Sequence, residues 1–275
     1  MVSKKTRLDI LLVERDLIET REKAKRTIMA GLVYSESTRL DKPGMKVDVD
    51  IPLTVKGKVI PYVGRGGLKL EKALKFFDVN VSEKIMVDIG SSTGGFTDCA
   101  LQNGASLSYA IDVGYNQLDW KLRNDERVVV MERTNFRYVT SDMFDRGLPD
   151  FATIDVSFIS LRLILPVLSK ILLENGEVIA LVKPQFEAGK EQVGRKGIVR
   201  DAKVHKQVLS NILSYARTEG FRTMGVTFSP ITGGDGNIEF LAHLKWDGIK
   251  EEASIEEIGI EQVVDEAHLS LKKDA

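Results

Sequence analysis

The chain contains the glycine-rich segment Val87-Asp-Ile-Gly-Ser-Ser-Thr-Gly-Gly-Phe-Thr-Asp98, from which its fold can be predicted. It begins as an apolar strand, passes through a glycine-rich turn and ends in residues that open a helix. Glycines let the backbone approach a ligand closely, and the first N–H groups of a helix have no partner within the helix. The stretch therefore predicts a strand–turn–helix unit with a ligand at the turn.

A second strand pattern, Leu-Ser-Tyr-Ala-Ile-Asp, ends at Asp112, 22 residues after Gly90. In α/β nucleotide-binding folds an acidic residue at this place binds the hydroxyls of an adenosine ribose. We therefore predict a nucleoside cofactor at the glycine turn. A purely structural turn is the alternative. The spacing also fits a dinucleotide fold, although Gly-x-Gly-x-x-Gly is absent.

Short apolar strands alternate with helical stretches from residue 85 onward, which predicts a doubly wound, mostly parallel sheet. The expected strands are residues 85–89, 107–112, 127–131, 150–155, 177–183, 222–228 and 237–244. Residues 186–203 are rich in Gly, Lys and Arg and are expected to form a loop, either a cover over the substrate site or a plain surface loop. The tail 251–275 has apolar residues at near-helical intervals and is predicted to be a docked helix.

Four charged residues stand at or beside the ends of segments that this pattern brings together. They are Lys69, Asp155, Lys183 and Glu239. Open α/β folds bind ligands at the carboxyl ends of their strands, so we expect these side chains at the ligand edge of the sheet. A lysine among other charges can lose its proton and act as a base. The alternative is a structural salt-bridge network.

Composition agrees with an intracellular globular enzyme. The chain has 275 residues, 29% charged and 43% hydrophobic, and its apolar runs are far shorter than a membrane span. No signal peptide is evident, and a cytoplasmic location is expected. The single cysteine, Cys99, is expected to pack as a small apolar residue. Three scattered histidines give no metal-binding spacing, so no metal is expected.

Charge is unevenly distributed along the chain. Residues 1–75 contain 17 Lys/Arg against 10 Asp/Glu, whereas the last 25 residues contain eight acids and two lysines. A basic front end indicates a bound polyanion or, equally, a solvated helix face. Residues 7–12 predict a helix, Thr20 is an N-cap for a short basic helix that reaches Gly31, and residues 45–51 alternate as a strand does.

Together these segments resemble the TlyA family of RNA 2′-O-methyltransferases, within the FtsJ/RrmJ-like group. The resemblance rests on residues 63–70, 88–98, 155–160, 181–187 and 236–240. The front end resembles the small RNA-binding domain named after ribosomal protein S-four, with Arg-Leu-Asp at 7–9 and a Gly-x-Val corner at 31–33. It departs from that domain at Thr20, where serine is usual, and at residues 34–36, where Val-Asn-Gly is common.

The resemblance implies a Rossmann-like, S-adenosylmethionine-dependent methyltransferase with seven strands, the last inserted antiparallel, after a small α+β RNA-binding domain. It also implies that Lys69, Asp155, Lys183 and Glu239 form the catalytic tetrad, with Lys183 as the expected base, although the choice between the two lysines stays open. The cofactor residues would be Gly90, Ser91, Ser92, Thr93, Gly94, Gly95, Phe96, Asp112 and Asn135. The RNA contacts would be Arg7, Arg21, Lys25, Arg26 and Arg65.

The expected organisation is an RNA-binding domain over 1–60, a hinge over 61–67, a methyltransferase domain over 68–250 and an acidic tail over 251–275. The substrate would be ribosomal RNA or a ribosomal subunit, with a cytidine as the modified nucleotide and no membrane partner; the oligomeric state stays open. Alternatives are a non-catalytic ribosome-assembly factor, a membrane-active haemolysin and, more distantly, an NAD-dependent oxidoreductase.

Overall fold

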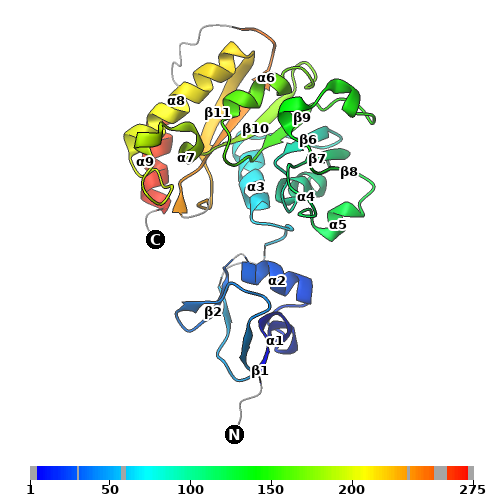
Figure 1. Ribbon diagram of the computed structural model, residues 1–275, viewed down its shortest axis with the longest axis vertical. Coiled ribbons are helices and arrows are strands. Elements are labelled where there is room, and N and C mark those ends of the chain that lie inside the picture. Colours follow the sequence, from blue (N-terminus) through cyan, green and yellow to red (C-terminus); the bar gives the residue numbers. More distant parts are fainter. Residues whose placement is uncertain (1–4, 30, 57–59, 234–235, 251–258, 272–275) are drawn as a thin grey trace. The chain divides into compact units, whose positions relative to one another are not determined.

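The computed structural model describes residues 5–29, 31–56, 60–233, 236–250 and 259–271. Contacts between residues divide the chain into two units, Met1–Arg65 and Gly66–Ala275. Each unit is considered by itself (Figure 1). Among the described residues no helix is long and apolar enough to cross a membrane.

The described residues of the first unit form two helices and five short strands. The helices are α1 (Leu8–Glu14) and α2 (Arg21–Met29). Strands β1 (Lys5–Arg7) and β4 (Lys46–Asp48) form an antiparallel pair, and β3 (Thr38–Arg39), β2 (Val33–Ser35) and β5 (Thr54–Val55) form a three-stranded sheet. Apolar residues spaced three and four apart on α1 meet those of α2 and β2 in one small core, since such residues share a helix face. This core contains Leu8, Leu12, Ala24, Ile28 and Val33.

The second unit is built on a seven-stranded sheet in the order β11-β12-β10-β9-β6-β7-β8. Its strands are β6 (Ile85–Ile89), β7 (Leu107–Ile111), β8 (Val128–Met131), β9 (Phe151–Ile154), β10 (Glu177–Val182), β11 (Phe221–Phe228) and β12 (Phe240–Trp246). β12 pairs antiparallel with both β10 and β11, whereas the pairs among β10, β9, β6, β7 and β8 are parallel. The predicted mostly parallel sheet with its last strand inserted antiparallel is confirmed.

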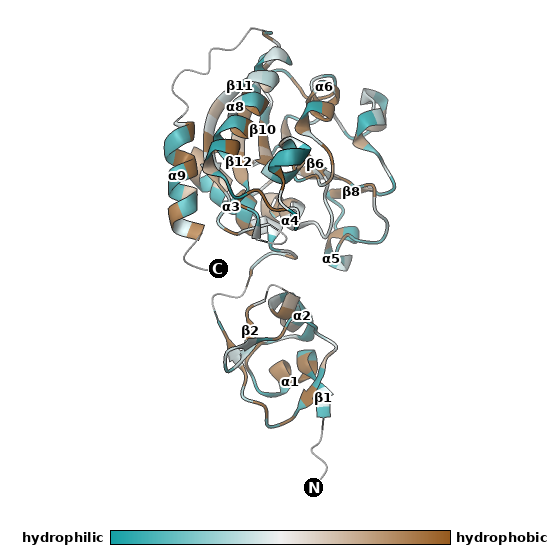
Figure 2. Ribbon diagram, turned by 60° about the vertical axis from the view of Figure 1, so that its left-hand side comes forward, coloured by the Kyte–Doolittle hydropathy of each residue, from teal (hydrophilic) through white to brown (hydrophobic). Residues whose placement is uncertain are grey.

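The two faces of this sheet bury different side chains because successive strand residues point to opposite sides. Val87, Ile89, Tyr109 and Ile154 belong to a large apolar cluster shared with helices α6 (Leu165–Leu168), α8 (Ala202–Thr218) and α9 (Ile260–Leu271). The strand residues that alternate with these face the opposite side of the sheet. The helices α3 (Gly66–Phe77) and α4 (Gly95–Gln102) lie on that side and contact each other. Hydrophobic and hydrophilic bands alternate along α8 and α9, as expected for helices with one buried side (Figure 2).

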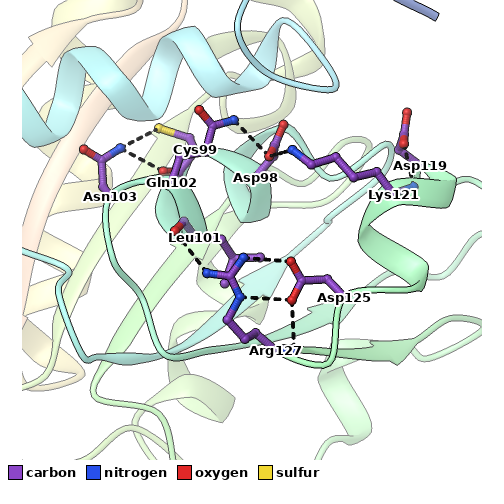
Figure 3. A network of polar contacts seen from close by, with 9 residues as sticks. All are labelled: Asp98, Cys99, Leu101, Gln102, Asn103, Asp119, Lys121, Asp125 and Arg127. Atoms are coloured by element: carbon purple, nitrogen blue, oxygen red, sulfur yellow. Dashed lines mark hydrogen bonds and ion pairs between the residues drawn. The ribbon is translucent and has the colours of Figure 1, made fainter.

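Polar contacts of Asp98 and Leu101 hold helix α4, which follows the glycine turn, to Lys121 and Arg127 (Figure 3). The buried Asp98 accepts hydrogen bonds from Gln102 and from Lys121 of α5 (Trp120–Arg123). Arg127 binds the Asp125 carboxylate and the Leu101 carbonyl. Cys99 is fully buried on this helix, so its predicted packing role is confirmed.

Two sequence-based boundaries were wrong. Residues 186–203 are not all loop: α7 (Pro184–Glu187), a short 3₁₀ helix (Lys190–Gln192) and the start of α8 at Ala202 fall within or across this range. α8 starts there because the Asp201 carboxylate caps it by accepting from the Lys203 N–H. The last strand starts at Phe240 instead of 237, because the Asn237 side chain bonds to the loop at Gly197 and Val199. Further short 3₁₀ helices cover Phe136–Tyr138, Ser141–Met143 and Leu161–Leu163.

The predicted tail helix is present as α9, while residues 251–258 and 272–275 lie outside the described residues. α9 packs on α8 through Val264 and Ala267 and through a pair of histidines. His205 of α8 is fully buried; its Nε2 lies 3.1 Å from the Val199 carbonyl and its Nδ1 lies 2.9 Å from Nε2 of His268. Because a carbonyl only accepts, His205 Nε2 donates to Val199 and His205 Nδ1 accepts from His268.

This histidine pair makes the stability of the second unit depend on pH. Burial, and then the nearby His268, lowers the pKa of His205 from 6.5 to about 4, although Asp201 acts in the opposite direction. In the unfolded chain His205 is protonated below pH 6.5, whereas in the folded chain it stays neutral down to about pH 4. The stability that neutral His205 contributes to the fold is therefore complete above pH 6.5 and is lost as the pH falls toward 4. The shift corresponds to about 3 kcal/mol. We expect urea unfolding to show that the free energy of unfolding falls between pH 7 and pH 4 by about 3 kcal/mol more in the wild type than in His205→Gln.

Comparison with the variant is needed because Asp88 changes stability in the opposite sense. Burial raises the pKa of Asp88 to about 6, so its contribution is lost as the pH rises through that range. Asp88 is present in both proteins and its effect cancels in the difference. Parallel pH dependences in the wild type and His205→Gln would contradict the prediction.

Candidate active site

The structure brings the four predicted charged residues together. Lys69 lies in the first turn of α3, Asp155 directly follows β9, and Lys183 directly follows β10. Glu239 directly precedes β12. Parallel strands place their carboxyl ends at one edge, and the antiparallel β12 places its amino end at that same edge. The topology therefore gathers residues up to 170 positions apart in the sequence.

These side chains form one continuous chain of ion pairs. Lys183 Nζ lies 2.5 Å from Asp155 Oδ1, Lys69 Nζ lies 3.6 Å from Asp155 Oδ2, and Lys69 Nζ lies 2.7 Å from Glu239 Oε2. The exposed fractions of the side chains are 9% for Lys183, 10% for Lys69, 20% for Asp155 and 3% for Glu239. Two cations and two anions thus balance in a site largely withdrawn from solvent, as buried charges require.

The two carboxylates give Lys69 a distinct electrostatic role. Burial opposes the charged form of Lys69, but the charges of Asp155 and Glu239 outweigh burial and raise the pKa of this lysine above its ordinary value. Burial likewise opposes ionisation of Asp155, but Lys69 and Lys183 outweigh it and lower the pKa of this carboxyl. Lys69 therefore remains a cation and Asp155 an anion near neutral pH. Lys183 contacts Asp155 alone of these two carboxylates.

Several neighbours of the tetrad were not identified from the sequence. Ser157 Oγ lies 3.1 Å from Lys183 Nζ, and the centre of the Phe186 ring lies 6.0 Å from the same nitrogen. Ser157 and Phe186 lie within residues 155–160 and 181–187, two of the segments on which the family resemblance rests. That position was the signal in the sequence that could have identified them. Gly233 lies against Glu239: a Cβ there would stand 2.2 Å from Glu239 Oε1. No local pattern in the sequence marks that approach.

Glycine is required at two positions of the glycine turn. Gly90 has φ +86°, and a Cβ there would lie 2.6 Å from the Asp155 carbonyl oxygen. Gly94 has φ +92°, and a Cβ there would lie 2.2 Å from Leu122 Cδ1. Side chains are excluded by both the backbone conformation and the space. The close approach at Gly90 places the turn directly beside the tetrad residue Asp155.

The turn presents donors that suit an anionic ligand group. Among the described residues, the backbone N–H groups of Thr93, Gly95 and Phe96 have no hydrogen-bond acceptor, whereas the Asp98 N–H bonds to Gly94. Asp112 follows β7, and its carboxylate accepts from the N–H groups of Ser92 and Gly114 at 2.8 and 2.7 Å. A free carboxylate on a ligand would satisfy the unpaired N–H groups at the helix start.

The remaining predicted cofactor residue, Asn135, caps the 3₁₀ helix Phe136–Tyr138 by accepting from the Arg137 N–H. Asp88, which sequence analysis did not single out, lies beneath the turn. It is fully buried and accepts from Thr97 N, Thr97 Oγ1 and Thr153 Oγ1 at 3.1, 2.7 and 2.9 Å. These bonds tie the start of α4 to the strand that precedes the turn.

The predicted RNA-binding residues of the first unit surround a buried carboxylate. Asp9 is fully buried and is bound by Arg7 and Arg21 at 2.9 and 3.1 Å. The hydrogen bond from Arg7 is the main cause that lowers the pKa of Asp9 to about 2. The side chains of Arg7 and Arg21 remain about half exposed, at 44% and 52%. Asp9 thus fixes two arginines at the surface of the unit.

The other RNA-binding candidates do not join that cluster. Lys25 forms a helix-surface pair with Glu22 at 2.7 Å, Arg26 is half-buried on the same helix, and Arg65 is exposed.

The fold and the site define a Rossmann-like methyltransferase: a seven-stranded sheet with β12 inserted antiparallel, a glycine turn and an ionic tetrad at one edge. The FtsJ-like methyltransferase family matches residues 62–246, and the S4 domain family matches residues 6–50. The chain belongs to the FtsJ-like methyltransferase family and carries an S4 domain before it.

Three comparisons extend along most of the chain. It is 68% identical over 274 residues to the "Putative rRNA methyltransferase YqxC" of Bacillus subtilis, covering 99% of this chain and 98% of that protein. It is 40% identical to the "16S/23S rRNA (cytidine-2′-O)-methyltransferase TlyA" of Mycobacterium tuberculosis, covering 89% and 91%. A solved structure described as "Putative hemolysin from Streptococcus thermophilus" has 54% identity and a TM-score of 0.78, covering 99% of both chains.

The approach of Gly233 to Glu239 gives a test that leaves the tetrad itself unchanged. Gly233→Ala would force the Glu239 carboxylate away from Lys69, because their 2.7 Å contact and a new Cβ cannot coexist. Displacement of a positioning group by about 1 Å costs on the order of 100-fold in rate. We expect methyl transfer to fall by about this factor in an initial-rate assay.

Gly189→Ala is the matched control for this substitution. Its Cβ would also stand 2.2 Å from a glutamate oxygen, that of Glu191, but Glu191 is exposed and can rotate away. Equal losses in the two variants would show that displacement of Glu239 is not the cause.

Proposed function

We propose that this chain transfers a methyl group from S-adenosylmethionine to a ribose 2′-hydroxyl of ribosomal RNA, with a cytidine as the modified nucleotide. The observation that carries the proposal is the ion-pair chain Lys183–Asp155–Lys69–Glu239 beside the glycine turn. The tuberculosis relative, described as a cytidine-2′-O-methyltransferase of 16S and 23S rRNA, supports the choice of substrate.

A ribose hydroxyl is a very weak acid, so its proton must leave as the oxygen attacks carbon. S-adenosylmethionine, when bound, supplies an electrophilic methyl carbon on a positively charged sulfur. Lys183 pairs with Asp155 as a cation, so it would first release a proton to solvent. Its neutral Nζ would then accept the hydroxyl proton while the oxygen–carbon bond forms and the carbon–sulfur bond breaks. Protonated Lys69 stabilises the negative charge that develops on the oxygen. Asp155 orients Lys183, and Glu239 holds Lys69.

The residues at the turn fit the cofactor. The unpaired N–H groups of Thr93, Gly95 and Phe96 would hold its carboxylate, within a cradle formed by residues 90–96. Asp112 would accept from the ribose hydroxyls, since each of its oxygens has bonded one N–H and retains acceptor capacity. Asn135 would border the adenine.

The first unit would bind the RNA. Arg7 and Arg21, fixed by Asp9, offer exposed donors to phosphates, and Lys25, Arg26 and Arg65 would add positive charge. The proposed organisation is an RNA-binding domain over 1–60, a hinge over 61–67, a catalytic domain over 68–250 and an acidic tail over 251–275. Gly66 and Gly67 of the proposed hinge are the first residues of α3. A ribosomal substrate implies a cytoplasmic protein.

Transfer of labelled methyl groups tests the function. Wild-type protein, S-adenosylmethionine labelled in the methyl group, and ribosomal subunits lacking the modification would be incubated, and the product mapped by resistance to alkaline cleavage. Label on a 2′-oxygen is the expected result, because a methylated 2′-oxygen cannot attack the neighbouring phosphodiester. Cofactor binding without incorporation into either subunit or free RNA would favour the assembly-factor alternative.

A further inference from the structure

Asn237 is a buried polar residue two positions before Glu239. Only 3% of it is exposed. Its side chain makes two hydrogen bonds to a loop distant in sequence: Oδ1 accepts from the Val199 N–H at 3.1 Å, and Nδ2 donates to the Gly197 carbonyl at 2.9 Å. A side-chain amide is suited to this place because it offers a donor and an acceptor side by side.

The loop that Asn237 binds is the continuation of the chain after Lys183. It runs from α7 to α8 and is anchored a second time at Val199, whose carbonyl accepts from His205 of α8. Val199 is therefore held through its N–H by Asn237 and through its carbonyl by His205. These bonds fix the end of the loop, residues 197–199, between Asn237 and α8.

The segment around Asn237 in turn determines where Glu239 lies. The Asn237 carbonyl accepts from the Gly233 N–H at 2.8 Å, and Gly233 is the residue against which the Glu239 carboxylate rests. The Glu239 carbonyl accepts from the Ser229 N–H at 2.8 Å. Residues 237–239 precede β12 and lack ladder partners of their own, so these contacts replace the sheet as the support for Glu239.

We propose that Asn237 is a positioning residue for the reaction: by fixing the chain between the loop after Lys183 and the start of β12, it holds Glu239 on Lys69. The inference rests on the proposed methyl transfer. Glu239 touches Lys69 at 2.7 Å, and Lys69 touches Asp155, so a displacement at Asn237 reaches every member of the tetrad. Asn237 itself acts only through Glu239.

Asn237→Asp is the most informative substitution, because it keeps the shape and the acceptor for Val199 but loses the donor to Gly197. Asn237→Ala removes both bonds. We expect kcat to fall about tenfold in Asn237→Asp and on the order of 100-fold in Asn237→Ala, because small displacements of catalytic groups lower the rate by such factors. The KM for S-adenosylmethionine and for the ribosomal subunit should stay within about twofold, since neither variant alters the glycine turn or the first unit.

Asp150→Ala is the matched control, because it removes a side-chain hydrogen bond to the Ile85 N–H at the opposite edge of the sheet without touching Asn237 or Val199. It should lower thermal stability and leave kcat unchanged. A kcat near the wild-type value in both Asn237 variants, or an equal loss of kcat in Asp150→Ala, would overturn the proposal. If the wild type itself transfers no methyl group, the proposed function has failed and not this inference.

Hydrogen exchange on the wild type gives a test that does not depend on a folded variant. The Val199 N–H should exchange as slowly as the N–H groups of the central strands, because it is buried and bonded to Asn237. Exchange of Val199 at the rate of the exposed loop residues Arg195 and Lys196 would refute the anchor on which the proposal stands.

Discussion

Lys183→Ala should reduce methyl transfer at least about 1,000-fold while S-adenosylmethionine still binds. General-base catalysis contributes on the order of 100- to 10,000-fold, and a 1,000-fold loss corresponds to about 4 kcal/mol of transition-state stabilisation. Lys183 is the tetrad lysine that contacts a single carboxylate of the tetrad, and no other described lysine lies beside Asp155 except Lys69, whose pKa is raised. The measurement is the single-turnover rate with labelled cofactor and unmodified subunits.

Arginine substitutions separate the base from the electrostatic stabiliser. Arginine keeps the positive charge but does not give up its proton near neutral pH. Lys183→Arg should therefore be as inactive as Lys183→Ala, although it can still pair with Asp155. Lys69→Arg should retain measurable activity, because a fixed cation is what the mechanism requires there. The reverse pattern would assign the base to Lys69 and contradict the mechanism.

Asp155→Asn should both inactivate and destabilise the second unit. The substitution leaves Lys69 and Lys183 largely buried with Glu239 as the one remaining anion of the tetrad. Removing one partner of a buried ion pair costs about 3–5 kcal/mol, and the 20% exposure of Asp155 places the expected loss near the lower end, about 3 kcal/mol. Denaturant unfolding followed by tryptophan fluorescence measures it, because Trp120 and Trp246 both lie in this unit.

A double variant distinguishes unbalanced charge from lost packing. Lys69→Met combined with Asp155→Asn removes one cation and one anion, so Lys183 and Glu239 balance again. The double variant should be more stable than Asp155→Asn alone. It would then lose less stability than the sum of the two single losses, which a double-mutant cycle reports as a favourable coupling energy between Lys69 and Asp155. Glu71→Gln, which breaks the exposed pair between Glu71 and Lys75, should change stability by less than about 1 kcal/mol. A double variant less stable than Asp155→Asn would exclude charge imbalance as the cause.

Much of the second unit follows from local patterns in the sequence. The alternation of apolar strands and helices predicted all seven strands, and their boundaries agree within a few residues. Buried strands are recognisable because both sheet faces are covered and their residues are continuously apolar. The antiparallel insertion of the last strand came from the resemblance to the family and is confirmed. The roles of the site residues stay predictions.

The less accurate parts are those where a side chain bonds to a distant backbone. The last strand begins three residues later than predicted because Asn237 binds Gly197 and Val199. The periodicity of apolar residues along the chain cannot indicate a hydrogen-bond partner that is distant in sequence. Arg7 and Arg21 were expected as RNA contacts, but their fixation by the buried Asp9 emerged only with the folded unit. Residues 186–203 were expected to be a loop, but part of the range is helical.

Local patterns were sufficient to predict the strands, the glycine turn and the four charged residues, because periodicity, glycine content and strand ends are properties of short segments. Three features became evident with the folded chain: Lys69 remains charged between Asp155 and Glu239, Gly233 bounds the Glu239 carboxylate, and Asn237 joins two separate segments. Those features depend on distances between atoms far apart in sequence. Sheet topology sets these distances, and electrostatic and steric energies change steeply over a few ångströms.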